Sequence, residues 1–258
     1  YTIKEGELLY AQAPTGIGKT ISTIFPSIKA IGEKLGERII YLTPKTINRK
    51  VAEDTFSNLR EQGLYFKTIT ITAKEKACCN SDFDCNPEVC KYAESYYDKV
   101  RPVIVEILKK EQHISKEILQ EYAQKYKVCP FELSLDVSMY CDGVICDYNY
   151  MLDPRVKLTR LSESSGNIVL IDEAHNLVNR AREMYSARLS KQMIMECKKI
   201  TKGKLSKLHG ILNKINTYFI GLRNECEEYE KSWFYENEAP KDLIKLLSLF
   251  TNESEKFL

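Results

Sequence analysis

Residues 8–31 hold the feature that most restricts the fold: an apolar run, a loop with two glycines, and apolar residues at helical spacing. The run Leu-Leu-Tyr-Ala (8–11) predicts a strand, and the apolar residues from Ile21 to Ile31 predict a helix. Glycine lets the backbone of the loop between them turn tightly, so that successive N–H groups face one centre. The positive end of the helix faces the same centre. The sequence therefore predicts a phosphate-binding loop.

The side chains of this loop are those that a nucleotide needs. Lys19 would reach the β- and γ-phosphates of ATP, and the hydroxyl of Thr20 would bind Mg²⁺. A plain strand-to-helix turn is the alternative, but it would not require this Lys-Thr pair. The residues expected to surround the phosphates are Ala13, Pro14, Thr15, Gly16, Ile17, Gly18, Lys19 and Thr20.

Short apolar runs alternate with helical patterns along much of the chain, which predicts an α/β fold with a parallel sheet buried on both faces. The alternation stops after Thr72 and resumes near Gly143, and only helical patterns follow Ser190. A helix is expected at 115–128, with Ser115 as its N-cap. The further strands are expected at 38–43, 66–71, 143–147 and 167–172. The expected segments are 1–72 and 139–190 for the sheet domain, 73–138 for an insertion, and 191–258 for an incomplete helical domain.

Composition excludes few functions. The 38 basic and 36 acidic residues give a net charge of +2, which neither favours nor excludes nucleic acid. There is no run of about 18 apolar residues and no secretory signal, so we expect no membrane span and a cytoplasmic protein. The chain opens without Met, and we interpret it as a piece of a longer protein.

An acidic motif, Asp172-Glu173-Ala174-His175, ends the apolar run at 167–172. Asp172 would hold Mg²⁺ through water, and Glu173 would orient and deprotonate the attacking water. A helix N-cap would also suit acidic residues at this point. The phosphate-binding loop upstream favours the catalytic interpretation.

The two motifs together resemble those of the superfamily 2 helicases. That resemblance implies that His175 couples nucleotide state to the grip on nucleic acid. It also implies that the segment 43–46, Thr-Pro-Lys-Thr, touches a DNA strand through Thr43, Lys45 and Thr46. A helix N-cap at either threonine is the alternative.

Nine cysteines are present, and seven of them lie between Cys78 and Cys146. We favour reduced thiols that bind a metal over disulfides. The expected ligands are Cys78, Cys85, Cys90 and Cys129, separated by six, four and 38 residues. No Cys-x-x-Cys pair occurs, and Pro130 follows Cys129, so the pattern favours a 4Fe–4S cluster over zinc. Cys79 could replace Cys78, and chance core cysteines are the alternative to any metal site.

Five segments narrow the resemblance to the XPD/DinG family of iron–sulfur helicases, and to its bacterial members in particular. They are Lys-Glu-Lys-Ala-Cys (74–78), Cys-Asn-Pro-Glu-Val-Cys (85–90), Val-Cys-Pro-Phe (128–131), the run 144–154 and Ile-Asp-Glu-Ala-His-Asn (171–176).

The resemblance implies a RecA-like first motor domain, an inserted 4Fe–4S domain and a helical arch. It also implies single-stranded and forked DNA as partners and movement in the 5′→3′ direction. Tyr148, Asn149 and Tyr150 would meet DNA, where tyrosines stack on bases. The alternative is that these tyrosines close the interface between the insertion and the sheet.

The segments that the family needs elsewhere, including the second motor domain with its arginine finger, are not found in this sequence. We therefore expect the chain alone to bind ATP weakly, hydrolyse it very slowly and unwind nothing. A zinc-stabilised nucleic-acid-binding module with a nucleotide switch is the competing function. An electron-transfer protein is disfavoured because it would have no use for a phosphate-binding loop.

Overall fold

The computed structural model describes residues 1–14, 16–44, 46–80, 84–233 and 235–257, which form two compact units, Tyr1–Tyr185 and Ser186–Leu258. In the described part of the chain, no helix is both long and apolar enough to cross a membrane.

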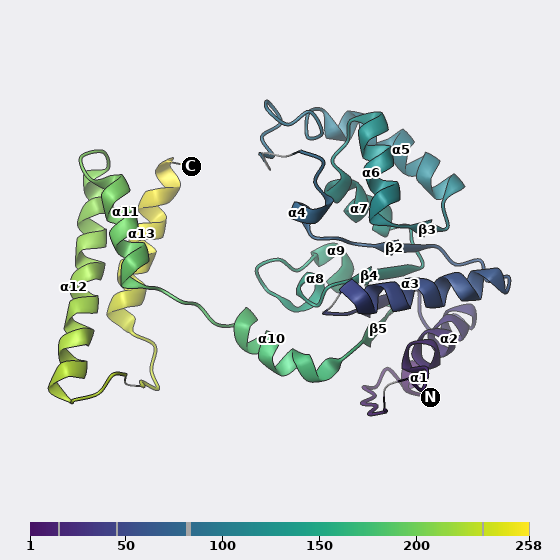
Figure 1. Ribbon diagram of the computed structural model, residues 1–258, viewed down its shortest axis with the longest axis horizontal. Helices are drawn as coiled ribbons and strands as arrows, with labels where there is room; N and C mark the ends of the chain where they lie inside the picture. Colours follow the sequence, from purple (N-terminus) through teal and green to yellow (C-terminus); the bar gives the residue numbers. More distant parts are fainter. Residues whose placement is uncertain (15, 45, 81–83, 234, 258) are drawn as a thin grey trace. The chain divides into compact units, whose positions relative to one another are not determined.

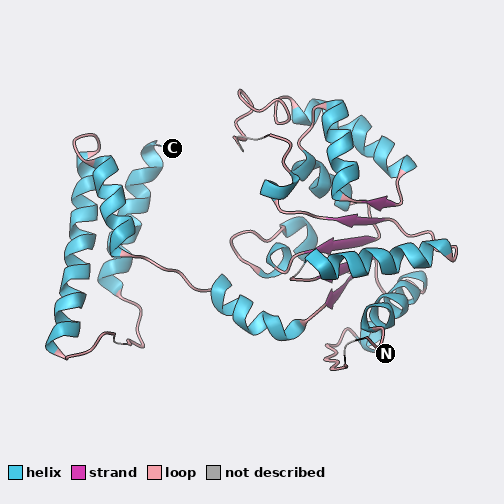
Figure 2. Cartoon of the chain, in the orientation of Figure 1, coloured by secondary structure: helices cyan, strands magenta, loops and turns pink. Residues whose placement is uncertain are grey.

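The first unit is an α/β fold around a parallel sheet, in the strand order β3-β2-β4-β1-β5 (Figures 1 and 2). The strands are β1 (Arg38–Leu42), β2 (Thr68–Thr70), β3 (His113–Ile114), β4 (Gly143–Cys146) and β5 (Asn167–Ile171). The helices are α1 (Thr2–Glu5), α2 (Lys19–Gly32), α3 (Thr46–Glu61), α4 (Lys74–Ala77), α5 (Tyr96–Lys110), α6 (Lys116–Tyr126), α7 (Pro130–Ser138), α8 (Asn149–Leu152), α9 (Thr159–Ser162), η1 (Ala174–Asn176) and α10 (Leu177–Met184).

Helices cover both faces of the sheet because neighbouring residues of a strand point to opposite sides. Ile39 and Tyr41 of β1 pack with apolar residues of α2 and α3. Ile40 and Leu42 pack in the other cluster, with residues of α5, α6 and α7. Strands β1, β2 and β4 are buried throughout, as a parallel sheet covered on both faces requires.

The predicted strand at residues 8–11 is wrong. These residues form no strand, and Leu8, Leu9 and Tyr10 are 84%, 73% and 86% exposed. Strand β5 lies at the end of the sheet, and no strand of the described residues lies on its other side. The outer edge of β5 is therefore unpaired among the described residues, and the apolar run does not occupy it.

The segment predicted as an insertion shares its core with the sheet. It adds a short strand, β3, beside β2, and its α5–α7 helices pack against the sheet. Ser115 caps α6 as predicted, since its hydroxyl accepts a hydrogen bond from the N–H of Ile118. The predicted domain boundaries stay predictions.

The second unit consists of helices alone. It contains α11 (Lys191–Thr201), α12 (Ser206–Glu228), α13 (Lys241–Ser254) and η2 (Glu255–Phe257). Ile194, Leu212 and Ile215 are its buried centre, and apolar residues of α13 pack against them. The predicted helices in this part of the sequence are confirmed.

Candidate nucleotide site

Three polar side chains follow three neighbouring strands at the same edge of the sheet. Thr43 follows β1, Asp147 follows β4, and Asp172 follows β5. In parallel sheets, ligands bind at the carboxyl ends of the strands. The acidic motif and the segment after β1 are therefore brought together at a position suited to a ligand.

The phosphate-binding loop has the backbone that its glycines permit. Gly16 and Gly18 have φ angles of 84° and 82°, and Gly18 is the N-cap of α2. Other residues are strained in this left-handed region. The Nζ atom of Lys19 donates a hydrogen bond to the carbonyl oxygen of Ala13 over 3.3 Å, so the lysine lies along the loop. Thr15 lies outside the described residues.

Tyr41 joins the loop to the acidic motif. Its hydroxyl lies close to the side chains of Thr20 and Asp172, the two residues predicted to bind Mg²⁺. Burial and the nearby carboxylate of Asp172 raise the pKa of Tyr41 to about 12, so it keeps its proton at neutral pH and can donate to Asp172. The side chain of Tyr41 therefore lies between the phosphate-binding loop and the acidic motif, which are more than 150 residues apart in the sequence.

The carboxylate of Asp172 is also held from helix α3. The Nδ2 atom of Asn48 donates to Oδ2 of Asp172 over 2.7 Å. The Oγ1 atom of Thr43 lies 3.5 Å from the same oxygen. Hydroxyl and carboxylate oxygens are the ligands that Mg²⁺ takes in proteins, so the donor set of Thr20 and Asp172 fits this ion.

The backbone of the acidic motif is fixed by a tyrosine from the segment after β4. Glu173 has a φ of 52°, in the left-handed region that few non-glycine residues adopt. The hydroxyl of Tyr148 donates to the carbonyl oxygens of Asp172 and Glu173. The side chain of Glu173 lies 3.4 Å from Nδ1 of His175, whose side chain is mostly exposed. These contacts leave the carboxylate and the imidazole at the surface of the site.

Burial argues against two of the predicted DNA contacts. Tyr148 is completely buried, and its hydroxyl is engaged by the acidic motif, so its ring has no free face for a base. Thr43 is also completely buried, and its hydroxyl faces Asp172. The resemblance to helicases implied these contacts, but in the structure both side chains pack against the acidic motif.

Tyr150 and Asn149 follow β4, at the same sheet edge. Tyr150 is half-buried and its ring lies 6.5 Å from that of Phe131 in α7, as expected if it closes the interface with the predicted insertion. Asn149 begins α8 and is half-buried. Thr46 begins α3, while Lys45 and the side chain of Thr46 lie outside the described part.

The four predicted cluster ligands lie in one neighbourhood. Lys74 forms a hydrogen bond with Cys85 and interacts with Cys129, and these thiols raise the pKa of its ammonium group. Tyr92 lies within electrostatic range of Cys78, Cys79 and Cys90.

Cys129 is the N-cap of α7, and burial raises the pKa of its thiol. The described residues nevertheless contain no group of three or more His, Cys, Asp or Glu side chains close enough to hold a metal ion. The donor chemistry fits a thiolate-bound cluster, and the assignment of ligands, Cys78 or Cys79 included, stays a prediction.

The other cysteines fill the core or lie on helices. Cys146 is completely buried within β4, as predicted, and burial raises the pKa of its thiol to about 12. Burial also raises the pKa of Cys141 to about 12. Both thiols are buried in the core, where a small apolar side chain packs well. Cys197 and Cys226 lie on α11 and α12.

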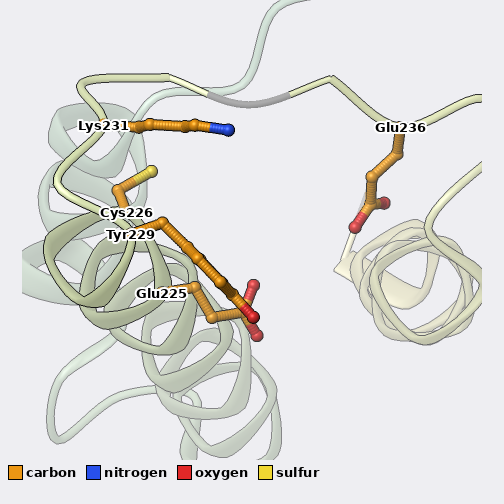
Figure 3. A pocket seen from close by; sticks show the side chains of 5 residues that line it. All are labelled: Glu225, Cys226, Tyr229, Lys231 and Glu236. Atoms are coloured by element: carbon orange, nitrogen blue, oxygen red, sulfur yellow. The ribbon is translucent and has the colours of Figure 1, made fainter.

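A separate pocket of about 320 Å³ lies in the helical unit (Figure 3). Glu225, Cys226, Tyr229 and Lys231 line it from the end of α12, and Glu236 faces them from the following loop. Two carboxylates against one ammonium group disfavour an anionic ligand. This pocket is therefore a poor candidate for a nucleotide or a DNA backbone.

Comparison with known proteins decides the family. The DEAD_2 family model matches residues 59–194, more than half of the chain, and the DEAD/DEAH box helicase model matches residues 1–83. The chain belongs to the DEAD_2 family. It is an XPD-like superfamily 2 helicase domain, as its sequence predicts.

Individual relatives of this DEAD_2 chain cover different parts of it. The general transcription and DNA repair factor IIH helicase subunit XPD of Dictyostelium discoideum is 32% identical over 42% of the chain and 13% of the relative. The regulator of telomere elongation helicase 1 homolog of Caenorhabditis briggsae is 24% identical over 72% of the chain and 23% of the relative. The chain thus spans less than a quarter of the length of these curated relatives.

Two solved structures that match this chain support the α/β fold of the first unit. A structure titled XPD_Helicase has a TM-score of 0.58 at 18% identity and covers 99% of this chain and 45% of that one. One titled Truncated XPD has the same TM-score and identity, and covers 98% and 74%. Together with the parallel sheet, this likeness identifies the first unit as a RecA-like motor fold.

Sequence reasoning missed Tyr41 and Asn48. Both lie near the carboxyl end of β1, and this position in the sequence could have indicated them. Residues at the ends of neighbouring parallel strands converge, so polar groups within β1 and in the first turn after it could have been paired with Asp172.

Proposed function

We propose that this chain supplies the first motor domain of an ATP-dependent DNA helicase. The observation that carries the proposal is the position of Tyr41 between Thr20 and Asp172, because it brings the phosphate-binding loop next to the acidic motif. The family matches support the same conclusion. The DNA-directed activity of the relatives supplies the substrate class.

In this proposal the N–H groups around Gly16 and Gly18 bind the phosphates, and Lys19 leaves Ala13 to reach the β- and γ-phosphates. Thr20 and Asp172 would hold Mg²⁺, which supplies charge neutralisation on the transferred phosphoryl group. Glu173 orients the attacking water and accepts its proton. His175 is exposed beside Glu173 and would couple the nucleotide state of the site to the binding of nucleic acid.

We further propose that Cys78, Cys85, Cys90 and Cys129 hold a 4Fe–4S cluster. Their shared neighbourhood around Lys74 and Tyr92 supports this assignment. The cluster would serve as a structural staple, because a segment of this size has a thin core of its own. In the described residues no disulfide joins any of the nine cysteines, which supports reduced thiols in this proposal.

The partners in this proposal are single-stranded and forked DNA. Lys45, Thr46, Asn149 and Tyr150 remain candidate contacts, and the second unit would be part of an arch. The strand would move 5′→3′ as two motor domains close and open. An arginine finger is worth roughly 10³–10⁵ in rate, so the second motor domain from the rest of the helicase is needed for activity.

The test is ATP hydrolysis by the full-length helicase with and without single-stranded DNA. Lys19→Ala should abolish DNA-stimulated turnover, because the phosphates lose their only positioned ammonium group in the loop. Lys29→Ala is the matched control, since this exposed lysine lies near the other end of the same helix. Equal activity of Lys19→Ala and the control would overturn the proposal.

A further inference from the structure

Asn48 has a role that the motifs do not assign. It is half-buried in the first turn of α3, and its amide nitrogen lies 2.7 Å from Oδ2 of Asp172. An amide nitrogen can only donate, so the contact fixes which atom of Asn48 faces the carboxylate. A hydrogen bond to a charged acceptor is also stronger than one between neutral groups.

The helix that carries Asn48 is itself fixed to the sheet. Ala52 and Phe56 on its inner face are completely buried. Farther along, Glu53 accepts a hydrogen bond from Thr70 of β2, and Arg60 donates to the hydroxyl of Thr68. A side chain in the first turn of such a helix has little freedom to move, so its amide is presented to Asp172 in advance.

Two separate elements therefore restrain one carboxylate. The hydroxyl of Thr43, directly after β1, lies 3.5 Å from Oδ2 of Asp172, and Asn48 donates to the same oxygen from α3. A carboxylate held by donors from two directions cannot rotate freely about its bond to Cβ. Groups that orient a metal ligand in this way usually change metal affinity 10–100-fold when they are removed.

We propose that Asn48 is the positioning residue for Asp172, holding its carboxylate in the orientation that receives Mg²⁺ with the nucleotide. This inference rests on the proposed function, because it takes Asp172 to be the ligand of Mg²⁺. Asn48 touches neither the nucleotide nor the reacting atoms. It acts through the carboxylate that it holds.

The experiment measures ADP binding to the full-length helicase by calorimetry, once with excess Mg²⁺ and once with EDTA. Asn48→Ala should lower the Mg²⁺-dependent gain in affinity about 10–100-fold and leave the affinity in EDTA unchanged. Asn48→Asp has the same shape but places a second carboxylate against Asp172, so it should lose at least as much. Asn48→Gln keeps the amide donor and should retain more of the gain than either variant.

Asn58→Ala is the matched control, because Asn58 is an exposed asparagine on the same helix. The positioning role is overturned if Asn48→Ala keeps the full Mg²⁺-dependent gain, if Asn48→Asp binds as well as Asn48→Gln, or if affinity in EDTA falls in parallel. Lys19→Ala distinguishes the two proposals. If it binds ADP as wild type does, the nucleotide site itself is wrong, whatever Asn48 does.

Discussion

Replacing Tyr148 by phenylalanine removes one hydroxyl from a completely buried side chain and leaves the ring in place. The hydroxyl donates to the carbonyl oxygens of Asp172 and Glu173, and burial raises its pKa, so it stays protonated. The carbonyl of Glu173 keeps two other donors, the backbone N–H and Nδ2 of Asn176. The cost therefore falls mainly on the carbonyl of Asp172. A buried polar group that loses its partner costs about 1–3 kcal/mol, and we expect a value near the lower end.

The assay is urea denaturation of the 258-residue chain, followed by circular dichroism. Tyr150→Phe is the control, because Tyr150 lies in the same segment and is half-buried against Phe131. We expect its free energy of unfolding to change by less than about 0.5 kcal/mol. If Tyr148→Phe unfolds at the same urea concentration as Tyr150→Phe, the hydroxyl does not support the acidic motif and the reasoning fails.

Two further predictions concern the predicted insertion. Protein purified without oxygen should contain about four iron and four sulfide per chain, and Cys85→Ser should lose the iron while ADP binding survives; about one zinc per chain would favour the competing module instead. Burial lowers the pKa of His113, so the folded protein favours its neutral form and stability should fall as pH drops through about 6.5, where the unfolded chain takes up the proton. His113→Gln should flatten this pH dependence in urea denaturation between about pH 7.5 and 5.5, and an unchanged slope would exclude His113 as its source.

Much of the first unit could be predicted because its strands are short apolar runs, of which β1 and β4 are buried on both faces. The runs that contain Ile39, Val144 and Ile168 stand out between helical patterns, and the sheet has strands at all three. Residues 8–11 have the same local pattern and form no strand. An apolar run shows that a segment could pair but not that it does, because the outer edge of β5 stays unpaired among the described residues while this run is exposed.

The motifs of the candidate site could be predicted from the sequence, but the residues that hold those motifs in place could not. The glycines at positions 16 and 18 indicate a left-handed backbone, and Asp172 indicates a charged group at the end of a strand. Tyr148 was assigned to DNA because a tyrosine after a strand is often exposed. Such a ring can point to solvent or pack against the acidic motif. The outcome depends on contacts between strands that are far apart in the sequence, and a local sequence pattern does not predict these contacts.

The alternation along β1 has a consequence for how this domain can evolve. Tyr41 serves the nucleotide edge, while its neighbour Leu42 is packed among helices of the cysteine-bearing segment. Shifting the strand by a single position would send the phenol among those helices and bury a leucine beside the carboxylate. An insertion or deletion within these five residues should therefore disrupt both the nucleotide site and the packing of the helices on the opposite face. This should hold whichever residue is gained or lost.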